Sequence, residues 1–342
     1  MKQKKRINSN SVLLLITISL FIAMYIVGCI IYADKGFSHF QTFLNILVTN
    51  AGLICVACGM TCAMLTGGID ISVGSLIAMD CMIMAVGMGV KGYPCGIMLI
   101  FVLVVGLVFG LVQGIMVGYL KIQPFIVTMA GMFFARGMTA VISTDQVSIT
   151  QETNAQFYAW ANAKINLPSF FGYTNNKGVL IVPFVRPTVI IALAVVVVIY
   201  IVLKYTKFGR SLYAVGGSES SATMMGLDVK RTKMKAYVLS SFLCSIGGIC
   251  YCLNTMSGSV QQAKGFEMTA IASSVIGGTL LTGGVGNIIG SFFGVLTTGT
   301  INTLVTTNGK LLSSWANIAT AALLCIFIIL QSVFSLYKQR KQ

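Results

Sequence analysis

The sequence predicts an all-α membrane protein of about ten transmembrane helices, built from two internally related halves. Three observations support this fold class. Hydrophobic residues fill 56% of the 342 positions and charged residues only 9%, whereas a soluble protein has roughly a quarter of its residues charged. Long apolar runs follow one another along the chain, and one glycine-rich motif occurs twice. The composition excludes soluble enzymes, nucleic-acid-binding proteins and disordered scaffolds.

The apolar runs are long enough to cross a membrane, because a helix needs about 20 residues to span ~30 Å of hydrocarbon. The first run follows a basic N-terminus, as in a signal peptide, but it is too long for one and lacks an A-x-A cleavage site. We therefore expect spans at 12–32, 44–65, 72–90, 96–119, 125–143, 187–203, 236–256, 266–282, 286–306 and 313–336.

The positive charge is distributed unevenly between the two sides of the membrane. A net charge of +15 would suggest a polyanionic partner in a soluble protein, but the positive-inside rule is the competing explanation here. Ten spans place both termini on one side, and 15 of the 23 basic residues then fall on that side, against seven on the other. Both termini are therefore predicted to be cytoplasmic.

This topology divides the single transmembrane domain, residues 1–342, into parts. The first half covers about 1–143, an external loop covers 144–186, and the second half covers about 187–337. The second half includes a cytoplasmic loop at 204–235, which carries seven of the basic residues. Long loops in a compact membrane protein usually have a function.

The most informative motif is Leu65–Ser75 (LTGGIDISVGS), which recurs as Leu281–Ser291 (LTGGVGNIIGS). Both copies share L-T-G-G and, after five residues, G-S, which indicates an internal repeat. Their glycine pairs, Gly67–Gly68 and Gly283–Gly284, would break a membrane helix, and the freed backbone groups need protein or a water-filled path around them. Broken helices at matching places in two halves point to a transport pathway. The sequence leaves open whether the copies run parallel or are inverted.

Two charged residues lie in the apolar regions beside these motifs. Asp70 follows the first glycine pair, where it could be the N-cap of the next helix, a polar group on the pathway, or both. Arg136 lies deep in a span, so it should face the bundle interior and find an acid or backbone carbonyls. Asp70 and Asp80 are the available acids. Structural pairing and substrate contact both remain open for Arg136.

The cytoplasmic loop contains the pattern of a short capped helix. Ser218 can cap it, Glu219 suits its first turn, and Gly226 can end it. Such a helix could be a rigid lever for a cytoplasmic partner, or the segment could be an ordinary solvated loop. The chain has no Walker A lysine, no metal-binding His/Glu pattern and only one histidine, His39. We expect it to be a transport protein rather than an enzyme, with no metal site.

Four stretches, in order along the chain, resemble the permease subunits of ribose/galactoside-type ABC importers. They are Leu65–Ser75, Phe125–Gly137 (FIVTMAGMFFARG), Phe208–Val229 and Ala270–Gly290 (AIASSVIGGTLLTGGVGNIIG). The similarity covers nearly the whole chain. Within that family, MAGMFFARG, the STDQVSI that follows it and Ser313–Trp315 look most similar to a permease of galactofuranose importers.

The resemblance implies an all-helical permease in a bacterial plasma membrane, paired with a second permease, alike or different. Two ABC ATPase domains, which bind ATP and Mg, would dock on the cytoplasmic side, and an extracytoplasmic sugar-binding protein would deliver the substrate. No cofactor in this chain and no nucleic-acid partner are implied. The residues that match the family's translocation-path signature are Gly67, Gly68, Asp70 and Ser72.

The loop that couples the permease to the ATPase in that family would match Gly216–Asp228. Its residues are Gly216, Gly217, Ser218, Glu219, Gly226, Leu227 and Asp228. Here Gly-Gly-Ser-Glu stands where the family often has Gly-Gly-Asn-Glu, and both Ser and Asn are good caps. Two alternatives remain: an ion-gradient-driven secondary sugar transporter, and a membrane-embedded enzyme acting on lipid-linked sugars.

Overall fold

The computed structural model describes residues 9–168, 170, 172–174, 180–312 and 314–339 of the chain. Among these residues, nine helices are long and apolar enough to cross a membrane. They are α1 (Ser9–Ile31), α2 (Phe40–Leu65), α3 (Val73–Ala85) with its π-helical extension η2 (Val86–Val90), α4 (Cys95–Gly118), α5 (Pro124–Ile142), α7 (Pro187–Tyr205), α10 (Val229–Thr255), α12 (Ile288–Asn308) and α13 (Ser314–Gln339). The all-α membrane fold is confirmed.

The structure differs from the expected ten spans in one region. Residues 266–282 contain only α11 (Phe266–Ile276), which has 11 residues and covers roughly half of the hydrocarbon thickness. Glycine explains where α11 ends, because Gly277 packs its Cα against the backbone of Gly290, and Gly278 has a positive φ of 91°. The chain then continues without a helix to Asn287, which caps α12.

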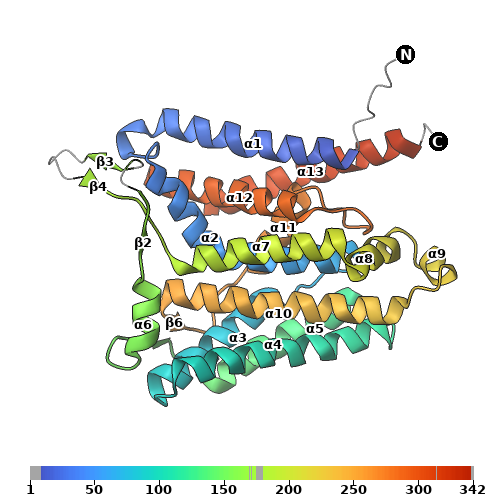
Figure 1. Ribbon diagram of the computed structural model, residues 1–342, viewed down its shortest axis with the longest axis horizontal. Helices are drawn as coiled ribbons and strands as arrows, with labels where there is room; N and C mark the ends of the chain where they lie inside the picture. The colour runs from blue at the N-terminus through green and yellow to red at the C-terminus, as the bar shows by residue number, and fades with distance from the viewer. Residues whose placement is uncertain (1–8, 169, 171, 175–179, 313, 340–342) are drawn as a thin grey trace.

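The remaining elements mark two ends of the bundle (Figure 1). One end, called here the α9 end, carries α8 (Lys207–Gly217) and α9 (Glu219–Met224), together with the start of α1 and the end of α13. The opposite α6 end carries α6 (Ala155–Asn162), the 3₁₀ turn η1 (Ala33–Lys35) and short strands. The strands form three antiparallel pairs, which are β1 (Val147–Ser148) with β6 (Ser257–Gly258), β2 (Ile165–Asn166) with β5 (Phe184–Val185), and β3 (Tyr173–Thr174) with β4 (Leu180–Ile181).

The two copies of the repeated motif run in the same direction. α3 leads from the first glycine break to the α6 end, where Gly89 of η2 packs against the carbonyl of Ser148. α12 leads from the second break to the same end, where Lys35 Nζ donates to the Thr307 carbonyl at 2.7 Å. The copies are therefore parallel rather than inverted, which the sequence alone leaves open.

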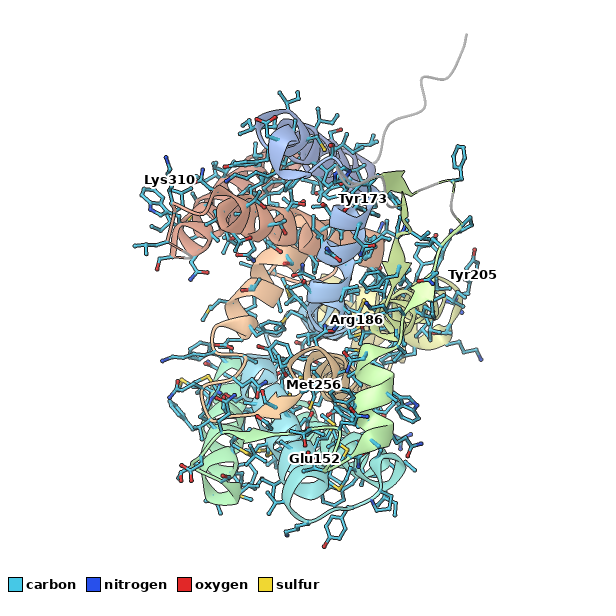
Figure 2. All side chains as sticks on the ribbon, turned by 90° about the vertical axis from the view of Figure 1, so that its left-hand side faces the viewer. Glu152, Tyr173, Arg186, Tyr205, Met256 and Lys310 are labelled. Atoms are coloured by element: carbon cyan, nitrogen blue, oxygen red, sulfur yellow. The ribbon has the colours of Figure 1, made fainter. Side chains whose placement is uncertain are left out.

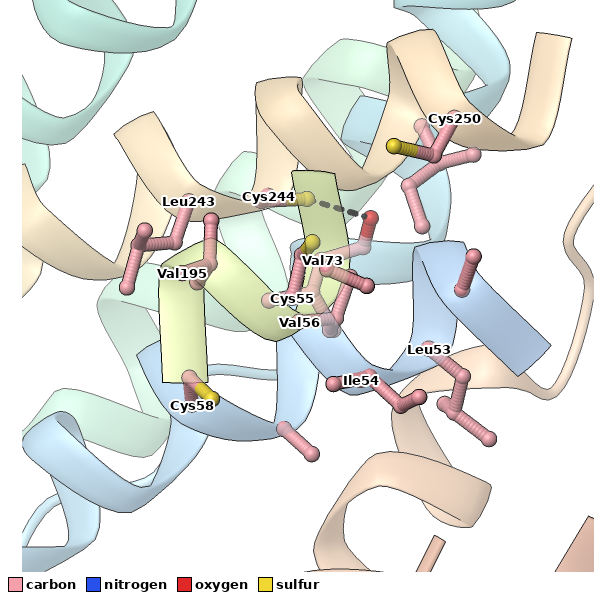
Figure 3. Packing of buried hydrophobic residues seen from close by; sticks show 14 of the residues in the cluster. Leu53, Ile54, Cys55, Val56, Cys58, Val73, Val195, Leu243, Cys244 and Cys250 are labelled. Atoms are coloured by element: carbon pink, nitrogen blue, oxygen red, sulfur yellow. Dashed lines mark hydrogen bonds between the residues drawn. The ribbon is translucent and has the colours of Figure 1, made fainter. Parts of the chain in front are cut away.

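The core lies where α2, α3, α7 and α10 meet (Figure 3). Cys55 and Val56 of α2 pack beside Val73 of α3, and the Cys244 thiol of α10 donates to the Val73 carbonyl at 3.1 Å. All ten cysteines are free, so the buried ones act as small apolar residues. α4 approaches α10 closely through glycines four residues apart, namely Gly106, Gly110, Gly114 and Gly118. α10 also lies beside the first glycine break, where a Cβ on Gly68 would overlap the Tyr237 hydroxyl.

Candidate translocation and coupling site

Both glycine breaks and the end of α8 meet at one point near the α9 end of the bundle. The Gly284 N–H donates to the Leu65 carbonyl at 3.0 Å. A Cβ on Gly216 would overlap that same carbonyl oxygen, and a Cβ on Gly283 would lie 2.9 Å from the Gly67 Cα. We call this meeting of Gly67, Gly216, Gly283 and Gly284 the glycine junction. Three segments distant in the sequence thus touch backbone to backbone.

Conformation requires glycine at three of these positions. Gly67, Gly283 and Gly284 have φ values of 78°, 88° and 74°, in the left-handed region that other residues rarely adopt. Gly216 is different, because it lies inside α8 with ordinary helical geometry and is required only by the close approach of the Leu65 and Gly284 backbones. Gly68 is also restricted by space, since a Cβ there would overlap the Tyr237 hydroxyl.

Tyr213 adds a side-chain link between α8 and the second break. Its hydroxyl donates to the Gly286 carbonyl at 3.0 Å. Burial raises the pKa of this hydroxyl to about 12, so it keeps its proton throughout the physiological range. α8 itself begins at Thr206, whose side chain accepts from the Gly209 N–H, and it buries Leu212 and Val215. α8 is therefore anchored to the membrane domain at both of its ends.

The expected capped helix in the loop is present as α9. Ser218 is its N-cap and accepts from the Ser221 N–H at 3.3 Å, and Glu219 lies in its first turn. Glu219 also forms an ion pair with Lys233 of α10. Gly226 follows the helix with a φ of 76°, and Asp228 then caps α10 by accepting from the Arg231 N–H at 2.9 Å. The loop is an ordered helical hairpin between α8 and α10.

The surface of α9 has two features suited to a protein partner. Met224 and Met225 are 81% and 67% exposed at its end, and methionine adapts readily to the shape of an apolar partner. Beside α9 lies a groove of about 700 Å³, lined by Val117, Gly118, Lys121, Ile122, Gln123, Pro124, Glu219, Thr223, Leu227, Asp228, Val229, Lys230 and Lys233. The groove joins α9 to the turn between α4 and α5.

Asp70 anchors the first break rather than capping α3 itself. The N-cap of α3 is Ser72, two residues later. One Asp70 oxygen accepts from the Ser72 N–H at 3.1 Å and from its hydroxyl at 2.5 Å, and the other accepts from the Ser240 hydroxyl of α10 at 2.8 Å. Gln113 of α4 donates to the Ser72 hydroxyl at 3.0 Å. All four side chains are buried, so Asp70 and Ser72 tie the break to α4 and α10.

Arg136 binds backbone carbonyls and neither Asp70 nor Asp80. Its Nη1 donates to the carbonyls of Val260 and Gln262 at 2.6 Å and 2.8 Å. These carbonyls belong to the irregular segment between α10 and α11. The nearby charge is Glu267, in the first turn of α11, which interacts electrostatically with Arg136. The sequence analysis missed Glu267. This residue lies at the start of the expected span 266–282, and an acidic residue is common at the start of any helix.

The site residues thus fall into three groups, two of which are in contact. The glycine junction connects to α9 through α8, and Asp70 and Ser72 hold the first break a few residues away. Arg136 bonds to neither group and lies beside Glu267. Nothing in the described ranges groups three His, Cys, Asp or Glu side chains as a metal site would need. The arrangement is suited to transmitting movement between backbone segments rather than to catalysis.

Comparison with known proteins identifies relatives along nearly the whole chain. A family model described as "Branched-chain amino acid transport system / permease component" matches residues 42–330. The chain is 38% identical to the inner membrane ABC transporter permease protein YjfF of Escherichia coli, over 96% of this chain and 94% of that protein. It is 34% identical to the fructose import permease protein FruG of Bifidobacterium longum, over 93% and 89% of the two chains.

A third relative is the ribose import permease protein RbsC of Bacillus subtilis. It is 34% identical to this chain, over 83% of this chain and 82% of that protein. No solved structure matches the chain significantly.

Proposed function

The chain belongs to the ABC transporter permease family of branched-chain amino acid transport system permease components, and we propose that it imports a monosaccharide into a bacterial cell. It is a transport component of an ABC importer in the plasma membrane, and ATP hydrolysis belongs to a partner chain. The curated names of two relatives refer to fructose and ribose. They support a sugar over the amino acid of the family's description, and the sequence resemblance favours the ribose, galactose or galactofuranose type.

The proposed complex contains this permease, a second permease subunit that is identical or related, and ABC ATPase subunits that bind ATP and Mg. An extracytoplasmic sugar-binding protein delivers the substrate. The chain itself needs no cofactor and contacts the lipid bilayer rather than nucleic acid. We place the α9 end in the cytoplasm, together with both termini, because the basic residues of 204–235 lie there. The α6 end then faces the binding protein.

The contact of Gly216 with Leu65 and Gly284 is the observation that carries the coupling mechanism. α9 inserts into the ATPase, and ATP-driven closure of the ATPase pair moves α9. α8 has close backbone contact with both breaks, so it transmits this displacement to the segments that start α3 and α12. A shift of these two helices would close the pathway to one side of the membrane and open it to the other. This is alternating access.

The pathway candidates follow from the same proposal. Gly67, Gly68, Gly283 and Gly284 provide flexible backbone at the cytoplasmic side, while Asp70 and Ser72 keep the first break attached to the bundle. Arg136 holds the irregular segment before α11 in place. Family membership favours ATP-driven import over the ion-gradient alternative, because ABC permeases move substrate with a partner ATPase.

Transport assays with the complete importer test the proposal. Proteoliposomes containing the transporter, with ATP and Mg inside and the binding protein outside, should accumulate radiolabelled D-ribose, D-galactose or D-fructose. Depleting the enclosed ATP should stop uptake, and an uncoupler that dissipates ion gradients should leave it unchanged. The opposite pattern would establish the ion-gradient mechanism and overturn the proposal.

A further inference from the structure

The segment between α10 and α11 is irregular backbone that lies inside the membrane. It is held by Arg136, which lies 12 residues after Pro124 and six before Ile142 in α5. At 1.5 Å per residue, these positions are roughly 18 Å and 9 Å from the two ends of the helix. Figure 2 looks along the bundle from the α6 end and shows Met256, where the segment starts, within its cross-section. The segment then runs inward along α3, because a Cβ on Gly74, in the first turn of α3, would lie 2.8 Å from the Ala263 carbonyl oxygen. The carbonyls that Arg136 binds therefore lie at hydrocarbon depth.

This segment and the start of α11 have an open side that carries polar groups. Gln261 and Lys264 are exposed, and Met268 is 59% exposed. Irregular backbone and charged side chains at this depth do not face lipid, because lipid cannot satisfy their hydrogen bonds or solvate their charge. The open side must therefore contact protein or water. A water-filled path is the arrangement that a transport protein requires there.

Glu267 lies at the back of this open side with an unsatisfied oxygen. Its Oε2 is buried without a hydrogen-bond partner and packs against Gly74, in the first turn of α3. α11 starts at Gly265, whose φ is 84° and which has no side chain to cap the helix. The positive ends of two helices and the Arg136 guanidinium thus surround the carboxylate. This combination of N–H donors, a guanidinium and an acceptor oxygen matches the hydroxyl groups of a sugar.

We propose that Arg136, Gln261, Lys264, Glu267 and Met268, called here the α11 mouth, form a wall of the water-filled sugar path. Within it, the second oxygen of the half-buried Glu267 carboxylate, Oε1, accepts hydrogen bonds from the hydroxyls of the passing monosaccharide, while Oε2 packs against Gly74. Arg136 is a positioning residue, because its guanidinium holds the carbonyls of Val260 and Gln262. This inference rests on the proposed import of a sugar and identifies where in the chain the sugar is contacted.

Cysteine labelling tests whether water reaches the α11 mouth. The exposed Cys325 and the half-exposed Cys29 are first replaced by Ser. Lys264→Cys and Met268→Cys are then compared with Val198→Cys, because Val198 is 54% exposed in the apolar span α7 and is expected to face lipid. The full transporter in membrane vesicles is treated with a membrane-impermeant cationic methanethiosulfonate. Labelling at 264 and 268 should be at least about tenfold faster than at 198, because only a thiolate in water reacts.

Equal and slow labelling at all three positions would mean that lipid or a partner protein covers the face, and would overturn the proposal. This assay needs no transport, so its result stands even if ATP-driven uptake fails and the proposed function falls. The role of Glu267 is tested by Glu267→Gln and Glu267→Asp in the proteoliposome assay, with the best-transported of D-ribose, D-galactose and D-fructose as probe. If none of these sugars is transported, the readout is how much each sugar slows the methanethiosulfonate labelling of Met268→Cys, with NaCl in place of the sugar as the reference.

Glu267→Gln should raise the half-saturating sugar concentration, or lower the protection, by about tenfold because a charged acceptor is lost. Glu267→Asp should restore part of it. Glu152→Gln at the α6 end is the matched control and should change neither quantity. A variant that only damaged the fold would lower the maximal rate and the amount of protein in the membrane instead. An unchanged half-saturating concentration in Glu267→Gln, or unchanged protection, would show that Glu267 does not bind sugar.

Discussion

The Gly284 N–H donates a hydrogen bond of 3.0 Å to the Leu65 carbonyl, and this one bond joins the two glycine breaks of the domain. Gly216 of α8 packs against the same carbonyl oxygen. Under the proposed coupling, a displacement of α8 would therefore act on both breaks. An alanine substitution at this junction should therefore reduce transport and stability only where the Cα of the glycine lies against another backbone segment.

Gly216→Ala should uncouple the ATPase from transport. The added methyl group would overlap the Leu65 carbonyl, and neither backbone can move aside without shifting a break. We expect sugar uptake to fall by at least about tenfold, since overpacking of this kind costs typically 1–3 kcal/mol. The measurement is uptake per ATP hydrolysed in proteoliposomes. Normal stoichiometry in this variant would contradict the coupling role of the junction.

Gly217→Ala is the matched control for that substitution. A Cβ at Gly217 has open space around it, and alanine in a helix is more stable than glycine by up to about 1 kcal/mol. The thermal stability of the purified permease should therefore be equal or slightly higher with Gly217→Ala and lower with Gly216→Ala. Equal losses in both variants would mean that helix geometry, not the contact with Leu65, explains the result.

Local patterns in the sequence predicted nearly all of the fold. Apolar runs identified nine spans, and Ser218 with Glu219 identified α9, because a span or a cap depends on residues close together in the chain. The tenth span was overestimated because Gly277 and Gly278 lie inside an apolar run, where hydropathy does not register a change of backbone direction. The parallel direction of the two repeats is established by contacts of η2 and α12 with the α6 end, and hydropathy carries no information about such contacts.

Tyr213→Phe should weaken the attachment of α8 to the second break. The variant loses the hydrogen bond to the Gly286 carbonyl and should unfold with a free energy lower by about 1 kcal/mol. The pKa of the hydroxyl is raised to about 12 from 10.0, so the folded state favours the protonated form. This contribution is fully present below pH 10 and is lost as the pH rises towards 12.

The measurement is the thermal midpoint of the purified permease between pH 8 and pH 11. The difference between the natural protein and Tyr213→Phe should be constant up to about pH 10 and shrink above it. Tyr205, which is 64% exposed on α7, provides the control variant Tyr205→Phe. A difference that grows with pH would show that Tyr213 is not hydrogen bonded through its proton.

The candidate site was less predictable than the fold. The sequence shows five Gly-Gly pairs, at 67–68, 216–217, 247–248, 277–278 and 283–284. Backbone-to-backbone contact leaves no pattern of side chains that would single out the first, second and fifth as the ones that meet. Asp70 was placed correctly beside the break, yet its partners Gln113 and Ser240 come from helices far along the chain. Glu267 was missed because its burial depends on the path of the irregular segment before α11, and a span pattern contains no information about that path.

Arg136→Met should loosen the segment between α10 and α11. The Val260 and Gln262 carbonyls would lose their donor, at about 1–3 kcal/mol for each buried group left unsatisfied. Arg136→Lys should retain part of the stability, because an ammonium can donate to both carbonyls without the planar geometry of a guanidinium. Protease cleavage in 256–265 reports the loosening, and unchanged resistance in Arg136→Met would contradict the anchoring role.

Asp70 offers a test that separates anchoring from a charge in the pathway. Asp70→Asn keeps an oxygen for the Ser72 groups, and the Ser240 hydroxyl can rotate to accept from the new amide. Asp70→Ala removes all of these bonds and leaves the Ser240 hydroxyl unpaired in a buried position, which should cost about 1–3 kcal/mol for each buried group left unsatisfied. If anchoring is the role, Asp70→Asn keeps most of the uptake and thermal stability, while Asp70→Ala loses both. A stable Asp70→Asn permease without uptake would instead establish that the negative charge itself acts on the substrate path.

The control is Asp228→Asn, which changes an exposed carboxylate at the cap of α10. It should lower the free energy of unfolding by at most about 1 kcal/mol, as the loss of an exposed ion pair does.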